Sequence, residues 1–233
     1  MPKYAFVNGR FVHHRDAFVH IEDRGYQFSD GVYEVIPIFN KKTIDADAHL
    51  DRLEYSLKQL KISLPTTRCV VEILIDELML KNQLSDGLVY IQITRGVAPR
   101  NHAFPIGPIK PAFVMTTKQI DFAKSKIEFE KGVKIITSKD LRWARRDIKT
   151  ISLLPNCLAK QEAVEQGAYE AWLIDQNGFI TEGTSSNAWI ITRDSKIITR
   201  KNDHDILNGI TRTTIIKLAQ ESGLNIIIDS FTL

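Results

Sequence analysis

The sequence has few cysteines, no long apolar run and almost no excess of charge. Its two cysteines, Cys69 and Cys157, are too far apart to indicate a disulfide framework or a zinc-ligand pair. No apolar run reaches the roughly 18 residues of a membrane-spanning helix, and residues 1–4 lack the apolar core of a secretion signal. The 31 basic and 28 acidic residues leave a net charge of +3, too dilute to favour nucleic acid or a membrane as partner. We therefore expect a cytoplasmic globular protein.

The motifs of several common catalytic classes are also absent. The patterns GxGxxG, GxxxxGK[ST], GxSxG and HExxH do not occur. The six histidines are not spaced like metal ligands. These absences argue against a dinucleotide-binding fold, a P-loop, an α/β-hydrolase and a zinc protease, and we expect no metal site.

Hydrophobic periodicity predicts alternating strands and helices. Residues 3–12 alternate apolar and polar side chains around Asn8-Gly9, which is a strong signal for a β-hairpin. Pro37 falls inside a predicted strand, which places that strand at a sheet edge or at a bulge. Strands are predicted at 31–40, 88–94, 112–116, 133–137, 169–174, 179–181, 188–192 and 224–229, and helices at 47–60, 66–82, 156–166 and 211–222.

A polar segment without clear periodicity divides the chain in two. We predict an interdomain linker at residues 119–125, between a small N-terminal α/β domain at 1–118 and a large C-terminal domain at 126–233. Strands and helices are mixed in both halves without the regular alternation of a parallel sheet. The predicted fold class is therefore α/β (α+β), with mixed sheets and flanking helices.

Two glycine-containing segments have the composition of phosphate-binding loops. Residues 207–213 lead through Gly209 into a predicted helix, whose first N–H groups and positive dipole end favour an anion. In residues 182–187, small hydroxyl side chains follow a glycine and can form a backbone nest for phosphate oxygens. Simpler interpretations remain open, because Thr211 or Thr213 can be an ordinary helix cap and residues 182–187 an ordinary turn.

Charged residues in two further segments favour chemistry on a small substrate. In an extended, proline-flanked loop Arg100 and His102 point the same way, so that they can bind one carboxylate together. Lys149 ends the basic segment 139–149 and has apolar neighbours. A lysine in apolar surroundings has a lowered pKa and can act as an amine nucleophile. The alternatives are a solvated loop and, for residues 139–149, a solvated basic face or a nucleic-acid patch.

In this order and spacing, the segments resemble the class IV, or fold type IV, pyridoxal-phosphate (PLP) aminotransferases. The resemblance covers nearly the whole chain. Its anchors are DRGYQFSDGVYE at 23–34, HLDRL at 49–53, DIKT at 147–150, EGTSSN at 182–187 and GITR at 209–212. Residues 94–102 are similar to the substrate loop of the D-amino-acid-specific members. The resemblance implies a two-domain fold with the cofactor between the domains.

The resemblance also implies a role for each candidate residue. Lys149 is expected to form the internal aldimine with PLP and then to shuttle the substrate proton as general base and acid. Glu182 is expected to pair with the pyridine nitrogen, which strengthens the electron sink. The cofactor phosphate is assigned to Arg52, Ile210 and Thr211, the ring face to Leu207, and the surrounding loop to Ser185, Ser186 and Asn187.

For the substrate, the resemblance assigns the α-carboxylate to Tyr33, Arg100 and His102. It implies a homodimer in which Arg100 and His102 serve the neighbouring subunit's site. The implied reaction is a ping-pong transamination through pyridoxamine phosphate, in which a D-amino acid such as D-alanine donates its amino group to a 2-oxo acid such as 2-oxoglutarate.

Other functions remain open at this stage. A branched-chain L-amino-acid transaminase and an aminodeoxychorismate lyase share the same scaffold, and a catalytically inactive relative acting through dimerisation is a further alternative. Two local features, Pro37 and the run Asn40-Lys41-Lys42, depart from the family pattern. Chains of this family usually continue well beyond the position of Leu233, so we expect the C-terminal domain to be truncated.

Overall fold

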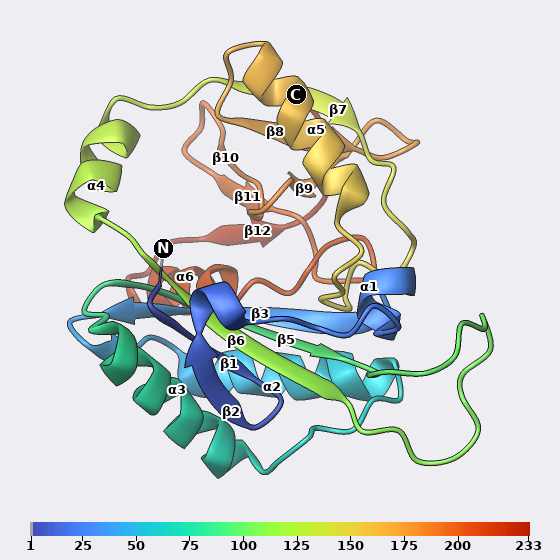
Figure 1. Cartoon of the computed structure of the whole chain (residues 1–233). Helices are drawn as coiled ribbons and strands as arrows, with labels where there is room; N and C mark the ends of the chain where they lie inside the picture. Colours follow the sequence, from blue (N-terminus) through green and yellow to red (C-terminus); the bar gives the residue numbers. More distant parts are fainter. Residues whose placement is uncertain (1) are drawn as a thin grey trace. The chain divides into compact units, whose positions relative to one another are not determined.

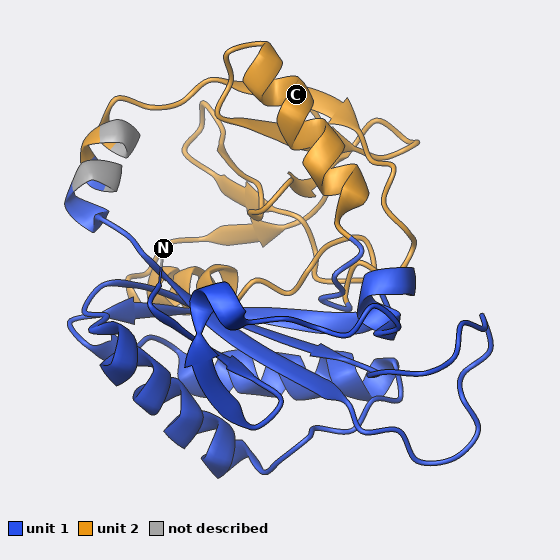
Figure 2. Cartoon of the chain, in the orientation of Figure 1, with its two compact units in different colours: residues 1–126, 148–152 blue, residues 127–147, 153–233 orange. Residues whose placement is uncertain are grey.

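The chain divides into two compact units (Figure 2). The computed structural model describes residues 2–233, except for the side chains at positions 124, 125, 128 and 129. Unit 1 comprises Met1–Lys126 and Ile148–Ser152, and unit 2 comprises Ile127–Asp147 and Leu153–Leu233. Lys149 therefore packs with unit 1, whereas the predicted boundary assigned it to the C-terminal domain. The segment predicted as a linker, 119–125, contains the last residue of one strand and the start of a helix, α4 at Phe122–Glu130.

Unit 1 contains one six-stranded sheet in the order β2-β1-β6-β5-β3-β4, and every pairing in it is antiparallel. Figure 1 shows this sheet with helices α2 and α3 along one face. The strands are β1 at Tyr4–Val7, β2 at Arg10–His13, β3 at Gly31–Phe39, β4 at Lys42–Thr43, β5 at Gly87–Thr94 and β6 at Ala112–Gln119.

The first hairpin follows directly from its turn residues. Asn8 and Gly9 have positive φ angles of 49° and 95°, as the central residues of a type I′ turn require. This turn matches the right-handed twist of the strands and sets the register in which Val7 faces Arg10. The hairpin predicted from the sequence is thus confirmed.

Strand β3 has one fully paired edge and one nearly open edge. It pairs along its whole length with β5, whereas β4 reaches only Ile38 and Phe39 on the other side. Pro37 therefore lies beside a largely open edge, as its missing N–H group predicts. The first residue of the strand is a glycine, Gly31. A Cβ atom at this position would lie only 2.8 Å from the carbonyl oxygen of Ile93, too close for any larger residue without a shift of the backbone. The open edge is where the segment 148–152 attaches.

Helices α2 at Ala46–Gln59 and α3 at Arg68–Asn82 bury their apolar faces against the sheet. Helix α2 packs on β3, and α3 packs on β1 and β6. Strand β3 alternates, so that every second side chain points to the helices. The core formed in this way includes Val32, Ile36, Ile38, Leu50, Leu53, Leu57, Val71, Ile75, Leu78, Ile91, Ile93 and Met115. Two short helices were not predicted, α1 at Arg24–Phe28 and the 3-10 turn at His14–Asp16.

Unit 2 contains two three-stranded sheets of mixed direction, in the orders β7-β8-β9 and β10-β11-β12. The pairs β7–β8 and β11–β12 are parallel, and the pairs β8–β9 and β10–β11 are antiparallel. The prediction of mixed sheets is confirmed here. The elements are β7 at Ile135–Lys139, α5 at Leu154–Glu165, β8 at Glu170–Ile174, β9 at Ile180–Gly183, β10 at Trp189–Ile191, β11 at Ile197–Thr199, α6 at Ile210–Glu221 and β12 at Ile226–Ile228.

Alanine and apolar residues form the cores of unit 2. Ala159 and Ala163 of α5 pack against Ala171 and Leu173 of β8, and the small alanine side chains let the helix approach the sheet closely. Among the described residues, no helix is both long enough and apolar enough to span a membrane.

The substitution Leu53→Ala tests the α2–sheet interface. Leu53 is 1% exposed in the core of unit 1, so its truncation removes buried apolar area and leaves a cavity. We expect the free energy of unfolding to fall by about 2–5 kcal/mol in urea titration. The neighbouring exposed Glu54→Ala variant is the control and should change it by less than about 0.5 kcal/mol. Equal effects of the two substitutions would contradict the packing described here.

Candidate active site

The backbone of Lys149 is fixed on the open edge of β3. Tyr33 N donates a hydrogen bond of 3.0 Å to the Lys149 carbonyl, and Ile151 N donates one of 3.2 Å to the carbonyl of Gly31. Between them, Thr150 forms an isolated antiparallel bridge with Val32. A segment distant in sequence is therefore held by strand-like pairing, which restricts its rotation as well as its position.

Helix α2 provides a further contact to the same residue. The Lys149 N–H donates to Ser56 Oγ over 3.2 Å, and Ser56 is fully buried. The Lys149 side chain extends over Tyr33, with Nζ 4.2 Å from the ring centroid. A cation above an aromatic face is attracted by the ring quadrupole. The amine therefore has a defined direction relative to β3.

A buried carboxylate, Glu34, lies on the core face of β3. Its side chain is 0% exposed, in an alternating position otherwise occupied by apolar residues. His49 Nδ1 donates to Oε1 over 3.0 Å, and the Val35 N–H donates to the same oxygen over 3.0 Å. Arg52 binds through two nitrogens, with Nε 2.9 Å from Oε2 and Nη2 2.6 Å from Oε1. The guanidinium of Arg52 is thus oriented by a planar two-point contact.

The charges around Glu34 determine its ionisation. Burial alone would raise the pKa of Glu34, but hydrogen bonds from His49 and Arg52, with the positive charges of Arg52 and Lys149, lower it to about 2. The carboxylate is consequently ionised and can only accept hydrogen bonds, so Nδ1 of His49 carries the hydrogen between them. Arg52 was predicted as a cofactor residue, whereas no role was predicted for Glu34 or His49. An acid in the buried register of a strand was the signal that could have identified Glu34.

In unit 2, the buried carboxylate of Glu182 accepts hydrogen bonds from three residues that lie in separate segments of the chain. The carboxylate is 4% exposed and accepts from Arg142 Nη1. Asn187 Nδ2 lies 3.0 Å from Oε2, and the Leu207 N–H lies 3.2 Å from both oxygens. Burial raises the pKa of Glu182, although Arg142 and the Leu207 N–H oppose this shift. The structure therefore brings together three of the predicted cofactor residues, Glu182, Asn187 and Leu207.

Two arginines of the basic segment 139–149 are buried in ion pairs, whereas Lys139 and Trp143 of the same segment are exposed. Arg142 binds both carboxylate oxygens of Asp140, at 3.0 and 2.8 Å, in addition to Glu182. Arg146 pairs with Asp205 at 2.8 Å, and its Nε lies 3.4 Å from Asp140. These arginines are largely buried in ion pairs, so their charges are neutralised inside unit 2. The sequence analysis did not predict the contact between Arg142 and Glu182, because 40 residues separate them.

The remaining predicted cofactor residues lie in a turn and a helix start of unit 2. Ser185 and Ser186 lie in the turn after β9, with their hydroxyl groups directed to Glu170. Ile210 and Thr211 form the first turn of α6, where helix geometry leaves N–H groups without an intrahelical acceptor. The residue before them is Gly209, and a Cβ atom there would collide with Oδ1 of Asn187.

Arg100 and His102 lie on an exposed loop of unit 1 and share one aromatic contact. Arg100 Cζ is 4.6 Å from the ring centroid of Phe28, and the His102 ring meets the same ring edge-on at 5.5 Å. Both side chains are exposed. Both side chains therefore contact Phe28, the last residue of α1.

Two buried arginines, Arg24 and Arg95, contact this loop and hold it in place. Arg24, 2% exposed, donates from Nη1 to the Asn101 carbonyl over 2.5 Å and from Nε to Asp30 over 2.7 Å. Arg95 also binds Asp30, at 2.7 and 3.0 Å, and its Cζ lies 3.6 Å from the ring centroid of Phe104. Asp30 thus holds two arginines that contact neighbouring residues of the loop, Asn101 and Phe104.

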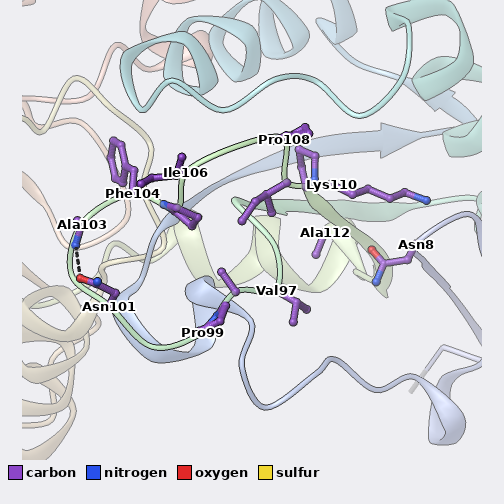
Figure 3. Close-up of a pocket in the computed structure, with 14 residues that line it drawn as sticks. Asn8, Val97, Pro99, Asn101, Ala103, Phe104, Ile106, Pro108, Lys110 and Ala112 are labelled. Carbon is purple, nitrogen blue, oxygen red and sulfur yellow. Dashed lines mark hydrogen bonds between the residues drawn. The ribbon is translucent and has the colours of Figure 1, made fainter.

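A cavity of about 840 Å³ lies along this loop (Figure 3) and is lined by residues 97–99, 101, 103–106 and 108–112 together with Asn8. Figure 3 shows the hydrogen bond by which Asn101 Oδ1 accepts from the Ala103 N–H, at 3.0 Å. This side-chain contact closes a local turn next to Arg100 and His102.

Comparison with known proteins assigns the family. The family described as amino-transferase class IV matches residues 31–233. The chain belongs to the class IV aminotransferases. It is 41% identical over 227 residues to a D-alanine aminotransferase of Staphylococcus epidermidis, covering 97% of this chain and 79% of that one. It is 43% identical over 218 residues to a D-alanine aminotransferase of Bacillus licheniformis, covering 94% of this chain and 75% of that one.

Solved structures agree on the fold. The branched-chain amino acid aminotransferase of Escherichia coli superposes with a TM-score of 0.90 at 23% identity, covering 100% of this chain and 79% of that one. A hypothetical aminotransferase from Mycobacterium tuberculosis, in its PLP-bound form, gives 0.83 at 21% identity, covering 99% and 82%. At these identities the likeness establishes the fold type. The predicted family, fold class and PLP cofactor are confirmed.

The donor groups of this aminotransferase fit PLP. An aldehyde-reactive amine is supplied by Lys149, a guanidinium suited to phosphate by Arg52, and a buried carboxylate suited to a protonated ring nitrogen by Glu182. The N–H groups at the start of α6 add an anion site of the kind that phosphates occupy. Each reactive part of the cofactor therefore has a chemically matched group in the chain.

The substitution Glu34→Gln tests the buried charge cluster through the pH dependence of stability. A carboxyl group whose folded-state pKa is lowered from 4.5 to about 2 stabilises the fold above pH 4.5, and this contribution is lost as the pH falls towards 2. We expect Glu34 to account for roughly 2 kcal/mol of the decrease in unfolding free energy between pH 6 and pH 3.

Urea titrations at the two pH values measure this difference. The Glu34→Gln variant should be less stable at pH 6 and lose less stability on acidification, whereas Glu54→Gln, at an exposed site of α2, should follow the parent protein. The same pH dependence in all three proteins would exclude the ion-pair assignment.

Proposed function

We propose that this aminotransferase exchanges amino groups between a D-amino acid, such as D-alanine, and a 2-oxo acid, such as 2-oxoglutarate. The observation that carries the proposal is the 40–43% identity to curated D-alanine aminotransferases over 94–97% of the chain. The paired Arg100 and His102 on Phe28 support it, because together they form a cationic and hydrogen-bonding group suited to an α-carboxylate.

In this proposal, Lys149 holds the cofactor and moves the substrate proton. PLP, when bound, supplies the electron sink that stabilises negative charge at the substrate Cα. With PLP bound, the Lys149 amine would take the proton from that carbon and deliver it to the C4′ position of the cofactor. Its backbone contacts to Tyr33 and Ser56 support this role, because a general base must be held in one orientation to be efficient.

The other candidate residues hold the cofactor in our proposal. Arg52 and the N–H groups of Ile210 and Thr211 bind the phosphate, and Glu182 keeps the ring nitrogen protonated. Burial raises the pKa of Glu182, so a cationic partner at the nitrogen favours its ionised form. Leu207 packs against the ring, and Ser185, Ser186 and Asn187 form the loop beside it.

We further propose a homodimer in which Arg100 and His102 act in the partner's site, while Tyr33 acts beside Lys149. Large exposed apolar side chains in this loop and in residues 18–26 support the dimer, since exposed apolar surface is frequent at interfaces. They are Phe18, Ile21, Tyr26, Val97 and Ile106, which are 76%, 76%, 75%, 45% and 105% exposed. The two cysteines are both exposed and free, which agrees with the reducing cytoplasm as the site of action.

An absorbance experiment tests the reaction and its handedness. The protein incubated with PLP and then desalted should retain the visible band of the bound cofactor, and D-alanine should bleach this band while L-alanine and L-leucine do not. The Lys149→Ala variant should lose multiple-turnover transamination by at least about 10³-fold, because it removes the amine that serves as general base and acid. Undiminished turnover would exclude the role of Lys149.

The alternative substrates give distinct results in the same assay. Bleaching by L-leucine alone would indicate a branched-chain L-amino-acid transaminase. Release of pyruvate from aminodeoxychorismate without an oxo-acid acceptor would indicate a lyase, and absence of any reaction in a PLP-loaded dimer would indicate an inactive relative.

The substitution Arg100→Ala tests carboxylate recognition. Loss of a charge-assisted contact costs about 1.5–3 kcal/mol, so we expect kcat/KM for D-alanine to fall roughly 10- to 100-fold, mainly through KM. Lys110→Ala removes another exposed cation from the same loop and should leave KM unchanged. Sedimentation of both variants checks that the dimer persists, and an unchanged KM in a dimeric Arg100→Ala enzyme would contradict the assignment.

A further inference from the structure

Glu170, the first residue of β8, receives four hydrogen bonds from the turn that follows β9. Its Oε1 accepts from Thr184 Oγ1 at 3.0 Å, from the Ser185 N–H at 2.9 Å and from Ser185 Oγ at 3.0 Å. Its Oε2 accepts from Ser186 Oγ at 2.5 Å. Glu170 is 6% exposed. One buried carboxylate thus accepts hydrogen bonds from three consecutive residues, Thr184, Ser185 and Ser186.

The turn is also closely packed around this carboxylate. A Cβ atom on Gly183 would lie 2.6 Å from Glu170 Oε2 and 2.5 Å from Ser186 Oγ. The backbone is fixed at both ends, since Gly183 N donates to the Ser186 carbonyl over 2.7 Å and Thr184 N donates to the Ala171 carbonyl over 3.2 Å. The turn is thus confined both by its own backbone hydrogen bonds and by the Glu170 carboxylate.

An ionised carboxylate accepts all four contacts with every donor directed towards it. An ionised carboxylate offers about four acceptor positions and no donor, whereas an amide of the same shape replaces one oxygen with an NH₂ group. At Oε2 that NH₂ would donate to Ser186 Oγ and so reverse the direction of this hydrogen bond, and at Oε1 it would face two hydroxyls and an N–H. The charge also fixes the hydroxyl hydrogens of Thr184, Ser185 and Ser186 towards Glu170, so that their oxygen lone pairs point elsewhere.

The turn leads directly to the residue that contacts Glu182. Asn187 follows Ser186, and its Nδ2 donates to Glu182 Oε2 and to the Leu207 carbonyl, each over 3.0 Å. Any displacement of the turn therefore moves Asn187 relative to Glu182 and to the loop before α6. The contacts run from Glu170 through the turn to the carboxylate assigned to the cofactor ring.

We propose that Glu170 is a positioning residue for cofactor binding, which holds the turn 183–187 in the conformation that places Ser185, Ser186 and Asn187 around PLP. The inference rests on the proposed function of these three residues as cofactor contacts. Glu170 itself acts through the turn, and its removal weakens PLP binding without removing any group assigned to the cofactor.

The test compares Glu170→Gln with a matched control, Glu162→Gln. Glu162 is an exposed glutamate of unit 2 that also accepts a serine hydroxyl, Ser138 Oγ at 2.8 Å. The PLP dissociation constant of the apoprotein is measured by titration of the visible band, and the melting temperature of the apoprotein is measured separately. We expect Glu170→Gln to weaken PLP binding at least 10-fold, and Glu162→Gln to leave it unchanged.

A second variant keeps the test decisive if Glu170→Gln does not fold. Thr184→Val removes one donor to Glu170 with little change in shape and replaces no residue assigned to PLP, and we expect it to weaken PLP binding by a smaller factor. Lower melting temperatures of both apoproteins with unchanged PLP dissociation constants would show a purely structural role and overturn the inference. Failure of the unsubstituted protein to bind PLP would overturn the proposed function, and this inference with it.

Discussion

The pairing of residues 148–152 with the open edge of β3 is the interaction on which the arrangement of unit 1 depends. A strand edge with unpaired N–H and carbonyl groups can bind a distant segment through its backbone alone. Here Tyr33 and Gly31 provide those groups, and Lys149 is the residue placed by them. The edge is open at that position because β4 reaches only the far end of β3. The reactive amine is therefore positioned by the sheet, although more than 100 residues separate it from β3.

Buried carboxylates organise both units, and each is neutralised within its own unit. Glu34 orients Arg52, and Glu182 is held by Arg142. Taking an isolated charge out of water costs several kcal/mol, so each carboxylate is tolerable only with its hydrogen-bond partners in place. The same contacts fix the directions of the groups that face the cofactor in our proposal. Stability and preorganisation thus arise from the same hydrogen bonds.

Buried charged residues also hold the exposed loop that carries Arg100 and His102. Its backbone carbonyls have no strand partner, and Arg24 supplies the missing donor while Asp30 holds Arg24 and Arg95 together. The loop is consequently anchored at its base although its functional side chains are exposed. A loop of this kind can present side chains to another molecule without first becoming ordered, which reduces the entropic cost of binding.

Much of the fold could be predicted from local patterns. The turn at Asn8-Gly9, the alternation in β3 and the helical spacing in α2 each depend on neighbouring residues, and all three were confirmed. Helix α4 was missed because its composition is polar and its periodicity weak. Short motifs also indicated Lys149 and Glu182 as candidates, together with the family and the cofactor, since a motif preserves residue type and order.

The partners of these residues could not be predicted in the same way. Glu34 and Arg52, Arg142 and Glu182, and Glu170 and the serine turn are separated by 18, 40 and about 15 residues in sequence, and no local periodicity specifies which distant side chain meets which. The sequence by itself determined the longer strands, the helices of 12 or more residues and the identity of the candidate reactive groups, because these follow from short-range geometry and residue chemistry. Only the tertiary structure decided which carboxylate holds which arginine or turn, because that depends on the register of the strands and the packing of the helices upon them.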